Sequence, residues 1–390
     1  MLSQLWPPEG AGFYGLMGQN ATSVNPFGDF NFVWFAYCDG SSQMSDNSEP
    51  VVYNGTALHM RGRALLDAHL AELEAQHAFL STATEVIVSG TSAGGQSTYM
   101  HASFIKSQLR APGARLVAVP DAGWWWSTRS YKSADAHPFL DMVTRAMPMW
   151  NGTLRGGSEH CLAAPPFGNR NLCFVQPYNY AYGLGDVEAF VVQSLVDPAN
   201  LGICYDMPCS LSGSTSGSCS ADEVAAILAF SRALKANITG AQAAFGARDG
   251  HFFDACSFHE QTCRSFDWFG VQVAGQTMNS SFYSACTPAR ARGGSLPLSL
   301  SPHPTPTHAR PSLDQPGTLR AARRPARAWR TASGPTTPPA ATPLARTARA
   351  GRAWLCDLLA FSTKLEPQLG TSRAQADPPS PASRPAPPWC

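Results

Sequence analysis

The apolar residues of segment 1–292 fall either in short unbroken runs or at helical spacing. The unbroken runs are rich in β-branched and aromatic side chains and end at Gly, Pro or Asp, as is typical of buried strands. The first of them is closed by Asp39-Gly40, a turn signal. We therefore predict strands at residues 31–38, 85–89, 115–119 and 190–196.

Between these runs, the spacing changes to steps of three and four. Leu66, Leu70, Leu73, His77 and Leu80 recur in this way and stack on one face of a helix. The pattern predicts helices at residues 60–80, 93–109 and 221–236, the last with Ser220 as its N-cap. Strands that alternate with helices imply parallel pairing with helical crossovers. The fold class is thus α/β, with a mostly parallel sheet and helices on both of its faces.

Two segments show neither the short apolar runs of strands nor the three- and four-residue spacing of helices. Residues 127–172 are rich in Pro, Gly and aromatic side chains, and we predict an irregular cap over the site there. Residues 293–390 hold 18 of the 32 prolines and carry a net charge of +8, which leaves about −7 on residues 1–292. Such a segment cannot bury enough apolar surface to offset its ordering entropy. We predict a folded domain over 1–292 and a disordered, Pro/Arg/Ala-rich tail over 293–390, with a short helical turn at 353–365.

The charge of the tail raises the question of partners. A basic segment can bind nucleic acid or another anionic polymer. No aromatic or glycine spacing accompanies the arginines of this tail, so we expect no nucleic-acid partner. No apolar run reaches the roughly 18 residues that cross a bilayer, so the sequence predicts no transmembrane segment.

Cysteines and glycosylation sequons favour an oxidising compartment for the folded part. Nine of the 11 cysteines lie in residues 1–292, and none has the Cys-x-x-Cys spacing of a zinc site. Cysteines scattered in this way through one domain predict disulfides. Asn-x-Ser/Thr sequons occur at Asn20, Asn54, Asn151, Asn237 and Asn279. We therefore predict a secreted glycoprotein, extracellular or in a cell wall, although the first residues do not form a signal peptide.

The candidate chemistry begins directly after the second predicted strand. Residues 90–94 read Gly-Thr-Ser-Ala-Gly, which fits the G-x-S-x-G pattern of a nucleophile elbow between a strand and a helix. In that turn the hydroxyl of Ser92 is exposed as a nucleophile, and the backbone N–H of Ala93 points at the developing oxyanion. The competing interpretation is a glycine-rich strand–helix turn without chemistry. The predicted strand before and helix after the motif favour the nucleophile.

A serine nucleophile needs a base, usually a histidine, that is oriented by a carboxylate. In α/β hydrolases the order along the chain is Ser, then acid, then His. Asp197 directly follows a predicted strand, which favours it as the acid; its rivals are Asp186, Asp206 and Glu188. The candidate bases after Ser92 are His101, His137, His160, His251 and His259. Spacing alone does not choose among them.

Several segments, in the same order, are similar to those of one known family. They are residues 33–42 (Val-Trp-Phe-Ala-Tyr-Cys-Asp-Gly-Ser-Ser), 89–95 (Ser-Gly-Thr-Ser-Ala-Gly-Gly), 121–126 (Asp-Ala-Gly-Trp-Trp-Trp), 190–201, 256–259 (Cys-Ser-Phe-His) and 267–278. Together they resemble the pectin acetylesterase/Notum family of α/β-hydrolase carboxylesterases, over about residues 15–286, and somewhat more its pectin acetylesterase branch. The resemblance implies Ser92 as nucleophile, Asp197 as acid and His259 as base, and leaves His251 a structural role.

The resemblance also implies a function. We expect a monomeric serine carboxylesterase, with no cofactor and no metal, that removes O-acetyl groups from acetylated cell-wall polysaccharide. Trp124 and Trp125 are the candidate substrate-binding residues, although we expect at least one tryptophan of the Trp124-Trp125-Trp126 run to be buried in the core. The alternatives are a Notum-like protein-lipid carboxylesterase and a catalytically impaired relative that binds glycan or protein.

One family feature is not found. Members carry an early strand ending in Glu-Gly-Gly-x-Trp-Cys, whose backbone amides supply the second half of the oxyanion hole, and no such pattern precedes Cys38. We therefore expect the first strand of the domain and one oxyanion donor to be missing, together with a signal peptide. Our hypothesis is a gene model that lacks its 5′ coding region; the alternative is a protein that is naturally shorter.

Overall fold

The computed structural model describes residues 15–281, with gaps, and residues 359–364. The gaps are residues 19–24, 26, 29, 36–38, 154–158, 212–217, 246–249, 263–267, 269, 271 and 279. The chain divides into two compact units. All described residues belong to the unit formed by Met1–Pro288 with Trp354–Cys390, and the other unit, Ala289–Ala353, lies outside them.

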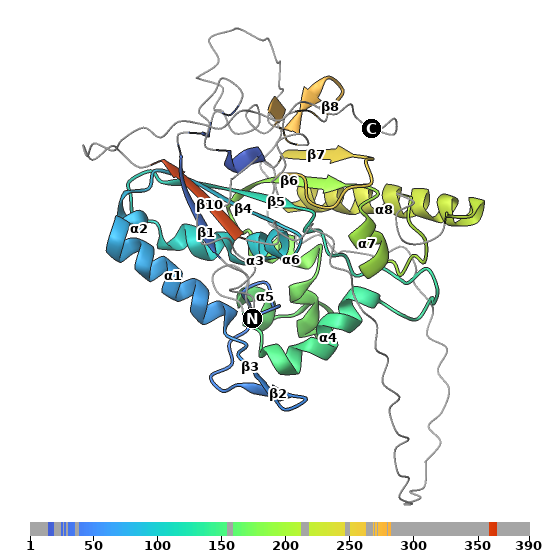
Figure 1. Ribbon diagram of the computed structural model, residues 1–390, viewed down its shortest axis with the longest axis horizontal. Coiled ribbons are helices and arrows are strands. Elements are labelled where there is room, and N and C mark those ends of the chain that lie inside the picture. The colour runs from blue at the N-terminus through green and yellow to red at the C-terminus, as the bar shows by residue number, and fades with distance from the viewer. Residues whose placement is uncertain are drawn as a thin grey trace, which may run out of the picture. The chain divides into compact units, whose positions relative to one another are not determined.

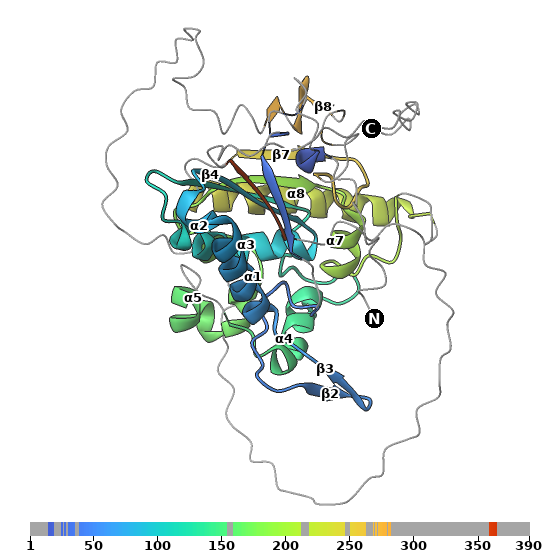
Figure 2. The same ribbon diagram turned by 60° about the vertical axis from the view of Figure 1, so that its left-hand side comes forward.

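A six-stranded sheet with the order β1-β10-β4-β5-β6-β7 forms the centre of this unit (Figure 1). Its strands are β1 (Asn31–Phe35), β4 (Glu85–Thr91), β5 (Arg115–Asp121), β6 (Glu188–Ser194), β7 (Gly250–Asp254) and β10 (Leu359–Lys364). Strands β4, β5 and β6 correspond to predicted strands and pair in parallel, as predicted, and β7, which is not among the predicted strands, pairs in parallel with β6. Two small hairpins, β2 (Val51–Tyr53) with β3 (Thr56–Leu58) and β8 (Gln272–Val273) with β9 (Gln276–Thr277), lie outside the sheet (Figure 2).

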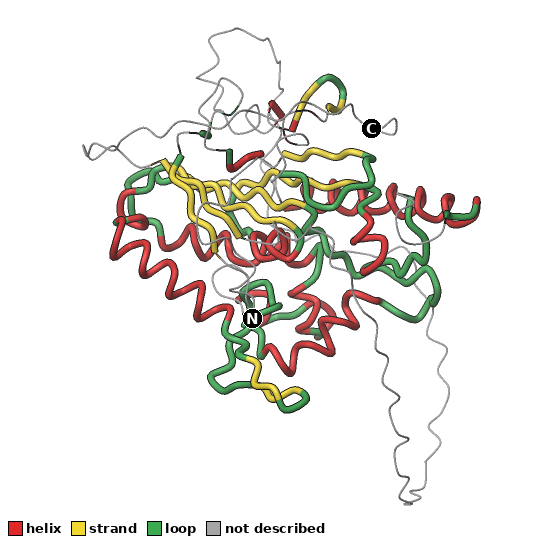
Figure 3. Tube along the Cα trace, in the orientation of Figure 1, coloured by secondary structure: helices red, strands yellow, loops and turns green. Residues whose placement is uncertain are grey.

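The helices flank the sheet, and the predicted α/β class is confirmed (Figure 3). They are α1 (Gly62–His77), α2 (Phe79–Thr82), α3 (Ala93–Gln108), α4 (Pro138–Trp150), α5 (Glu159–Ala163), α6 (Tyr178–Gly183), α7 (Pro198–Ile203) and α8 (Ala221–Phe245). The long helices α1, α3 and α8 bury their apolar residues against one side of the sheet, in a cluster with Val86, Val88 and Leu116. The opposite side, with Ile87 and Val117, packs on residues outside these long helices, among them Leu16, Phe27, Trp268 and Met278. No helix among the described residues is long and apolar enough to cross a membrane.

The structure corrects the prediction for the C-terminal segment at one point. We expect a helical turn within residues 353–365, but Leu359–Lys364 form strand β10 instead. This strand pairs antiparallel with β1 on one side and with β4 on the other. An apolar run of this length fits a strand as well as a helical turn. Here the unpaired backbone N–H and C=O groups of the neighbouring strands favour the strand, because a strand can pair with them. The rest of the predicted disordered tail lies outside the described residues.

The prediction of an irregular segment at 127–172 is wrong in part. Residues Pro138–Trp150 form the 13-residue helix α4, with Pro138 in its first turn and Pro148 inside it. A proline is tolerated at the start of a helix but normally interrupts the interior of one. For this reason the sequence pattern does not predict α4. Phe139 and Val143 bury one face of α4 in a second apolar cluster that also holds Trp125.

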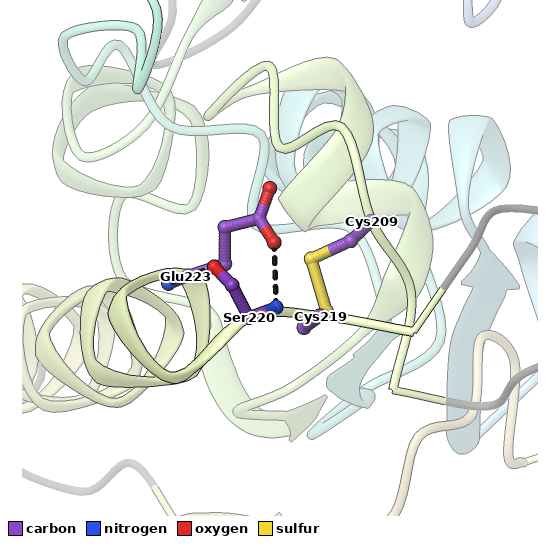
Figure 4. The surroundings of a disulfide bond; sticks show 4 residues. All are labelled: Cys209, Cys219, Ser220 and Glu223. Carbon is purple, nitrogen blue, oxygen red and sulfur yellow. Dashed lines mark hydrogen bonds between the residues drawn. A yellow bond between two sulfur atoms is a disulfide. The ribbon is translucent and has the colours of Figure 1, made fainter.

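Disulfides and a helix cap stabilise the segments around the sheet. Cys161 pairs with Cys173 and Cys209 with Cys219, and Cys256 is also disulfide-bonded, so the prediction of disulfides is confirmed. Figure 4 shows the Cys209–Cys219 bond directly before the start of α8. There the backbone N–H of Ser220 donates to the Glu223 carboxylate at 2.7 Å, and the N–H of Glu223 donates to Ser220 Oγ at 3.3 Å. This capping box confirms Ser220 as the N-cap. Secretion and glycosylation stay predictions.

Candidate active site

Ser92 lies on the turn between β4 and α3 and has a strained backbone. Its φ is +55° and its ψ −116°, a region that residues with a Cβ rarely adopt. Its backbone N–H donates to the carbonyl oxygen of Asp121, 2.9 Å away at the end of β5. Ala93 is the first residue of α3, and its role as an oxyanion donor stays a prediction. The turn holds residue 92 at the carboxyl edge of the parallel strands, where α/β sheets bind their ligands.

Two glycines let α3 pack closely on the end of β5. A Cβ on Gly95 would overlap the carbonyl oxygen of Asp121, and a Cβ on Gly123 would lie 2.5 Å from the carbonyl carbon of Gly95. Neither position therefore accepts a side chain without a backbone shift. The motifs Ser-Ala-Gly-Gly and Asp-Ala-Gly thus meet in one contact, which fixes the turn of Ser92 against the neighbouring strand.

His259 and Asp197 are in direct contact. Nδ1 of His259 lies 2.9 Å from Oδ2 of Asp197 and 3.0 Å from its Oδ1. Asp197 follows β6 and is the N-cap of α7, and its Oδ1 accepts hydrogen bonds from the N–H groups of Ala199 (2.8 Å) and Asn200 (3.3 Å). These bonds orient a carboxylate that has no exposed surface, whereas the His259 side chain remains partly exposed. The structure thus brings the predicted acid and base together.

The charges around His259 favour its protonated form. Burial alone disfavours an imidazolium, but the carboxylate of Asp197 outweighs that effect, helped by the charges of Glu260 and Asp121. Together they raise the pKa of His259 to about 9. These charges stabilise the imidazolium that forms when His259 accepts a proton, and they also leave only a small neutral fraction of His259 at pH 7.

The rival acids are all paired elsewhere. Asp186, Asp206 and Glu188 each form an ion pair with a cationic side chain. Their partners are Lys106, Lys132 and Arg115, respectively. Each of these pairs is partly or largely exposed, unlike the buried carboxylate of Asp197.

The rival histidines also have other neighbours. His251 lies in β7, with Nδ1 2.8 Å from Oε1 of Gln242 and its ring stacked on Phe253 at 4.3 Å. His101 is buried in α3, where Nε2 lies 3.1 Å from the carbonyl oxygen of Ser42. The remaining two are His137, directly before α4, and His160 in α5.

The two predicted substrate-binding tryptophans differ in their surroundings. Trp124 has no exposed surface, and its Nε1 donates to Oδ1 of Asn237 at 2.9 Å, so at least one tryptophan of the run is part of the core, as expected. Trp125 is also buried, stacks on Phe139 of α4, and has its ring centre 5.9 Å from that of His259. Its Nε1 donates to the carbonyl oxygen of Ser92 at 3.2 Å. Trp125 thus contacts both the turn of the serine and the histidine.

Asp121 also belongs to this site; it begins the family-like segment 121–126, but the sequence alone assigns it no role. Its carboxylate is fully buried, and Oδ2 accepts hydrogen bonds from the N–H groups of Gln261 (2.5 Å) and Thr262 (2.6 Å). The sequence signal that points to Asp121 is its position at the end of a strand, because Asp121 ends β5 much as Asp197 follows β6. Among the residues that the structure describes, no group of three His, Cys, Asp or Glu side chains is arranged to hold a metal ion.

A strained strand–helix turn with a serine, and a histidine–carboxylate pair in loops at the same sheet edge, define the architecture of the α/β hydrolases. Comparison with known proteins is more specific. The chain belongs to the pectinacetylesterase family, whose family model matches residues 3–286.

Individual relatives agree with this assignment. Pectin acetylesterase 5 of Arabidopsis thaliana is 23% identical over 270 residues, which cover 66% of this chain and 59% of that protein. The human palmitoleoyl-protein carboxylesterase NOTUM is 25% identical over 218 residues, 52% of this chain and 40% of that protein. The structure of the Wnt deacylase Notum from Drosophila has the same fold, with a TM-score of 0.59 at 19% identity over 73% of this chain and 75% of that one. The chain thus spans about three fifths of the first relative and two fifths of the second.

Proposed function

We propose that this protein is a serine carboxylesterase that removes O-acetyl groups from cell-wall polysaccharide. The observation that carries the proposal is the contact between the buried Asp197 carboxylate and His259. Trp125, which touches both His259 and the turn of Ser92, supports the view that the three residues act together. Relatives named as pectin acetylesterases and as a palmitoleoyl-protein carboxylesterase support ester hydrolysis.

The proposed mechanism is acyl transfer through a covalent intermediate. Oγ of Ser92 attacks the ester carbonyl while Nε2 of His259 accepts its proton, and Asp197 holds the imidazole through Nδ1. The N–H of Ala93 stabilises the oxyanion. Collapse of the tetrahedral intermediate returns the proton to the leaving alcohol and leaves an acyl group on Ser92. Water, deprotonated by His259, then releases the acid and restores the serine.

The length of the acyl group distinguishes the two esterase candidates. We expect kcat/KM for 4-nitrophenyl esters to be highest for acetate and to fall by about tenfold or more at octanoate, because the large ring of Trp125, stacked on Phe139, lies beside His259. Release of acetate from acetylated pectin checks the natural substrate class. A rate that increases with chain length instead favours a protein-lipid carboxylesterase. Failure of a fluorophosphonate to label Ser92, with no turnover of any ester, favours the non-catalytic binding relative.

The pKa of His259 predicts an alkaline rate profile. Since His259 must be neutral to accept the proton of Ser92, the rate falls as pH drops below the pKa of about 9. We therefore expect kcat/KM to rise from pH 7 with a midpoint near 9, well above the ordinary histidine value of about 6.5. Initial rates corrected with a Ser92→Ala blank measure this midpoint free of spontaneous hydrolysis. A midpoint at or below 6.5 would contradict the charge arrangement around His259.

A further inference from the structure

Asp121 contacts both halves of the site. Its backbone carbonyl oxygen accepts the N–H of Ser92 at 2.9 Å. Its side-chain Oδ2 accepts three hydrogen bonds from the segment directly after His259: from the N–H of Gln261 (2.5 Å), the N–H of Thr262 (2.6 Å) and Oγ1 of Thr262 (2.9 Å). One residue at the end of β5 therefore joins the turn of the serine to the loop of the histidine.

The contact spans segments that are far apart in the sequence and excludes water. Asp121 has no exposed surface, and Gln261 and Thr262 are nearly as buried. A second buried carboxylate supports the same loop, since Asp254 accepts hydrogen bonds from Nε2 of Gln261 (2.7 Å) and from the N–H of Cys256 (2.9 Å). The segment from residue 256 to residue 262 is thus held at both ends by carboxylates, and His259 lies in its middle.

The charge of Asp121 also acts on this loop. Burial raises the pKa of Asp121 to about 6, although its hydrogen bonds oppose the shift. Among the described titratable groups, the ionised carboxylate interacts favourably with a protonated His259 and unfavourably with Asp254. Removing the negative charge therefore lowers the pKa of His259, in addition to any change in geometry.

We propose that Asp121 is a positioning residue, which fixes the loop of His259 relative to the turn of Ser92 and stabilises the protonated imidazole. The proposal rests on the proposed ester hydrolysis for its meaning in catalysis. Asp121 touches neither ester nor water in this role. It acts through the two segments that it joins and through the charge of its carboxylate on His259. A displacement of about 1 Å between nucleophile and base is enough to cost roughly 10²-fold in rate.

The test compares Asp121→Asn with the parent. Asparagine keeps an oxygen that accepts hydrogen bonds but has no charge, so we expect kcat to fall at least tenfold while KM changes less than about threefold. We also expect the midpoint of the His259 titration, followed by NMR of its imidazole C–H groups, to fall by about half a pH unit or more. The matched control is Asp186→Asn, which removes an exposed carboxylate paired with Lys106 and should leave kcat within about twofold.

A second variant tests the proposal in case Asp121→Asn does not fold. Thr262→Val removes only the hydroxyl donor and leaves both backbone N–H groups on Asp121, so we expect a folded protein with kcat reduced about threefold at unchanged KM. A folded Asp121→Asn protein with kcat within twofold of the parent and an unchanged His259 midpoint overturns the proposal. If Asp121→Asn does not fold, unchanged kcat in Thr262→Val overturns it. If the parent protein hydrolyses no ester, the proposed function is wrong. The NMR titration of His259 in the parent and in Asp121→Asn then still tests the role of Asp121.

Discussion

Replacing Ser92 by alanine is expected to lower kcat for ester hydrolysis by about 10⁴-fold or more. Removal of a serine nucleophile takes away the covalent route and leaves only the stabilisation supplied by binding and the oxyanion donors. The substitution removes a single oxygen and keeps the Cβ, so the strained backbone of residue 92 stays as it is. Steady-state rates with 4-nitrophenyl acetate, together with loss of fluorophosphonate labelling, measure the effect.

Glycine at the same position is the matched control. It also lacks the hydroxyl, but it adopts a φ of +55° without the cost that a Cβ imposes. We therefore expect Ser92→Gly to be as inactive as Ser92→Ala and to have a Tm about 2–4 °C higher, which corresponds to about 1 kcal/mol. Equal Tm values would show that the backbone of this turn is not strained. A Ser92→Ala protein that keeps a tenth of the parent's kcat would remove Ser92 from the mechanism.

The sheet around this turn is predictable from sequence because its signals are local. Residues 85–89 and 115–119 each contain a short apolar run, Val86–Val88 and Leu116–Val119, with clear ends, and each range lies within an observed strand. Strand β10 is different, since its six residues lie among prolines and arginines and become a strand only by pairing with β1 and β4. Helix α4 is hard to predict because of Pro148 in its interior, whose cost is offset by the burial of Phe139 and Val143.

The residues of the candidate site also differ in how far the local sequence identifies them. The turn of Ser92 is specified by five consecutive residues, so a local sequence pattern is enough to identify it. Asp197 and His259 are 62 positions apart, and spacing leaves several rivals, which only the resemblance to a family reduces to one pair. Asp121 contacts residues 140 positions away. No short pattern encodes that contact, so its role becomes visible only when the strands and loops are assembled.

Asp197→Asn is expected to lower kcat by about 10⁴-fold with little loss of stability. An asparagine keeps one oxygen, which continues to accept the N–H groups of Ala199 and Asn200 and so preserves the cap of α7. Its amide group, however, replaces Oδ2 and donates a hydrogen bond to Nδ1 of His259 where the carboxylate accepted one. The imidazole then carries its proton on Nε2 and has no free electron pair for the proton of Ser92.

Two further variants separate orientation from structure. Asp197→Ala loses both the acceptor for His259 and the cap of α7, so it should be as slow as Asp197→Asn and less stable by about 1 kcal/mol. Asp186→Asn, which removes a carboxylate of the exposed pair with Lys106, should keep kcat within about twofold. If Asp197→Asn retains more than a tenth of the parent's kcat, Asp197 is not the orienting acid.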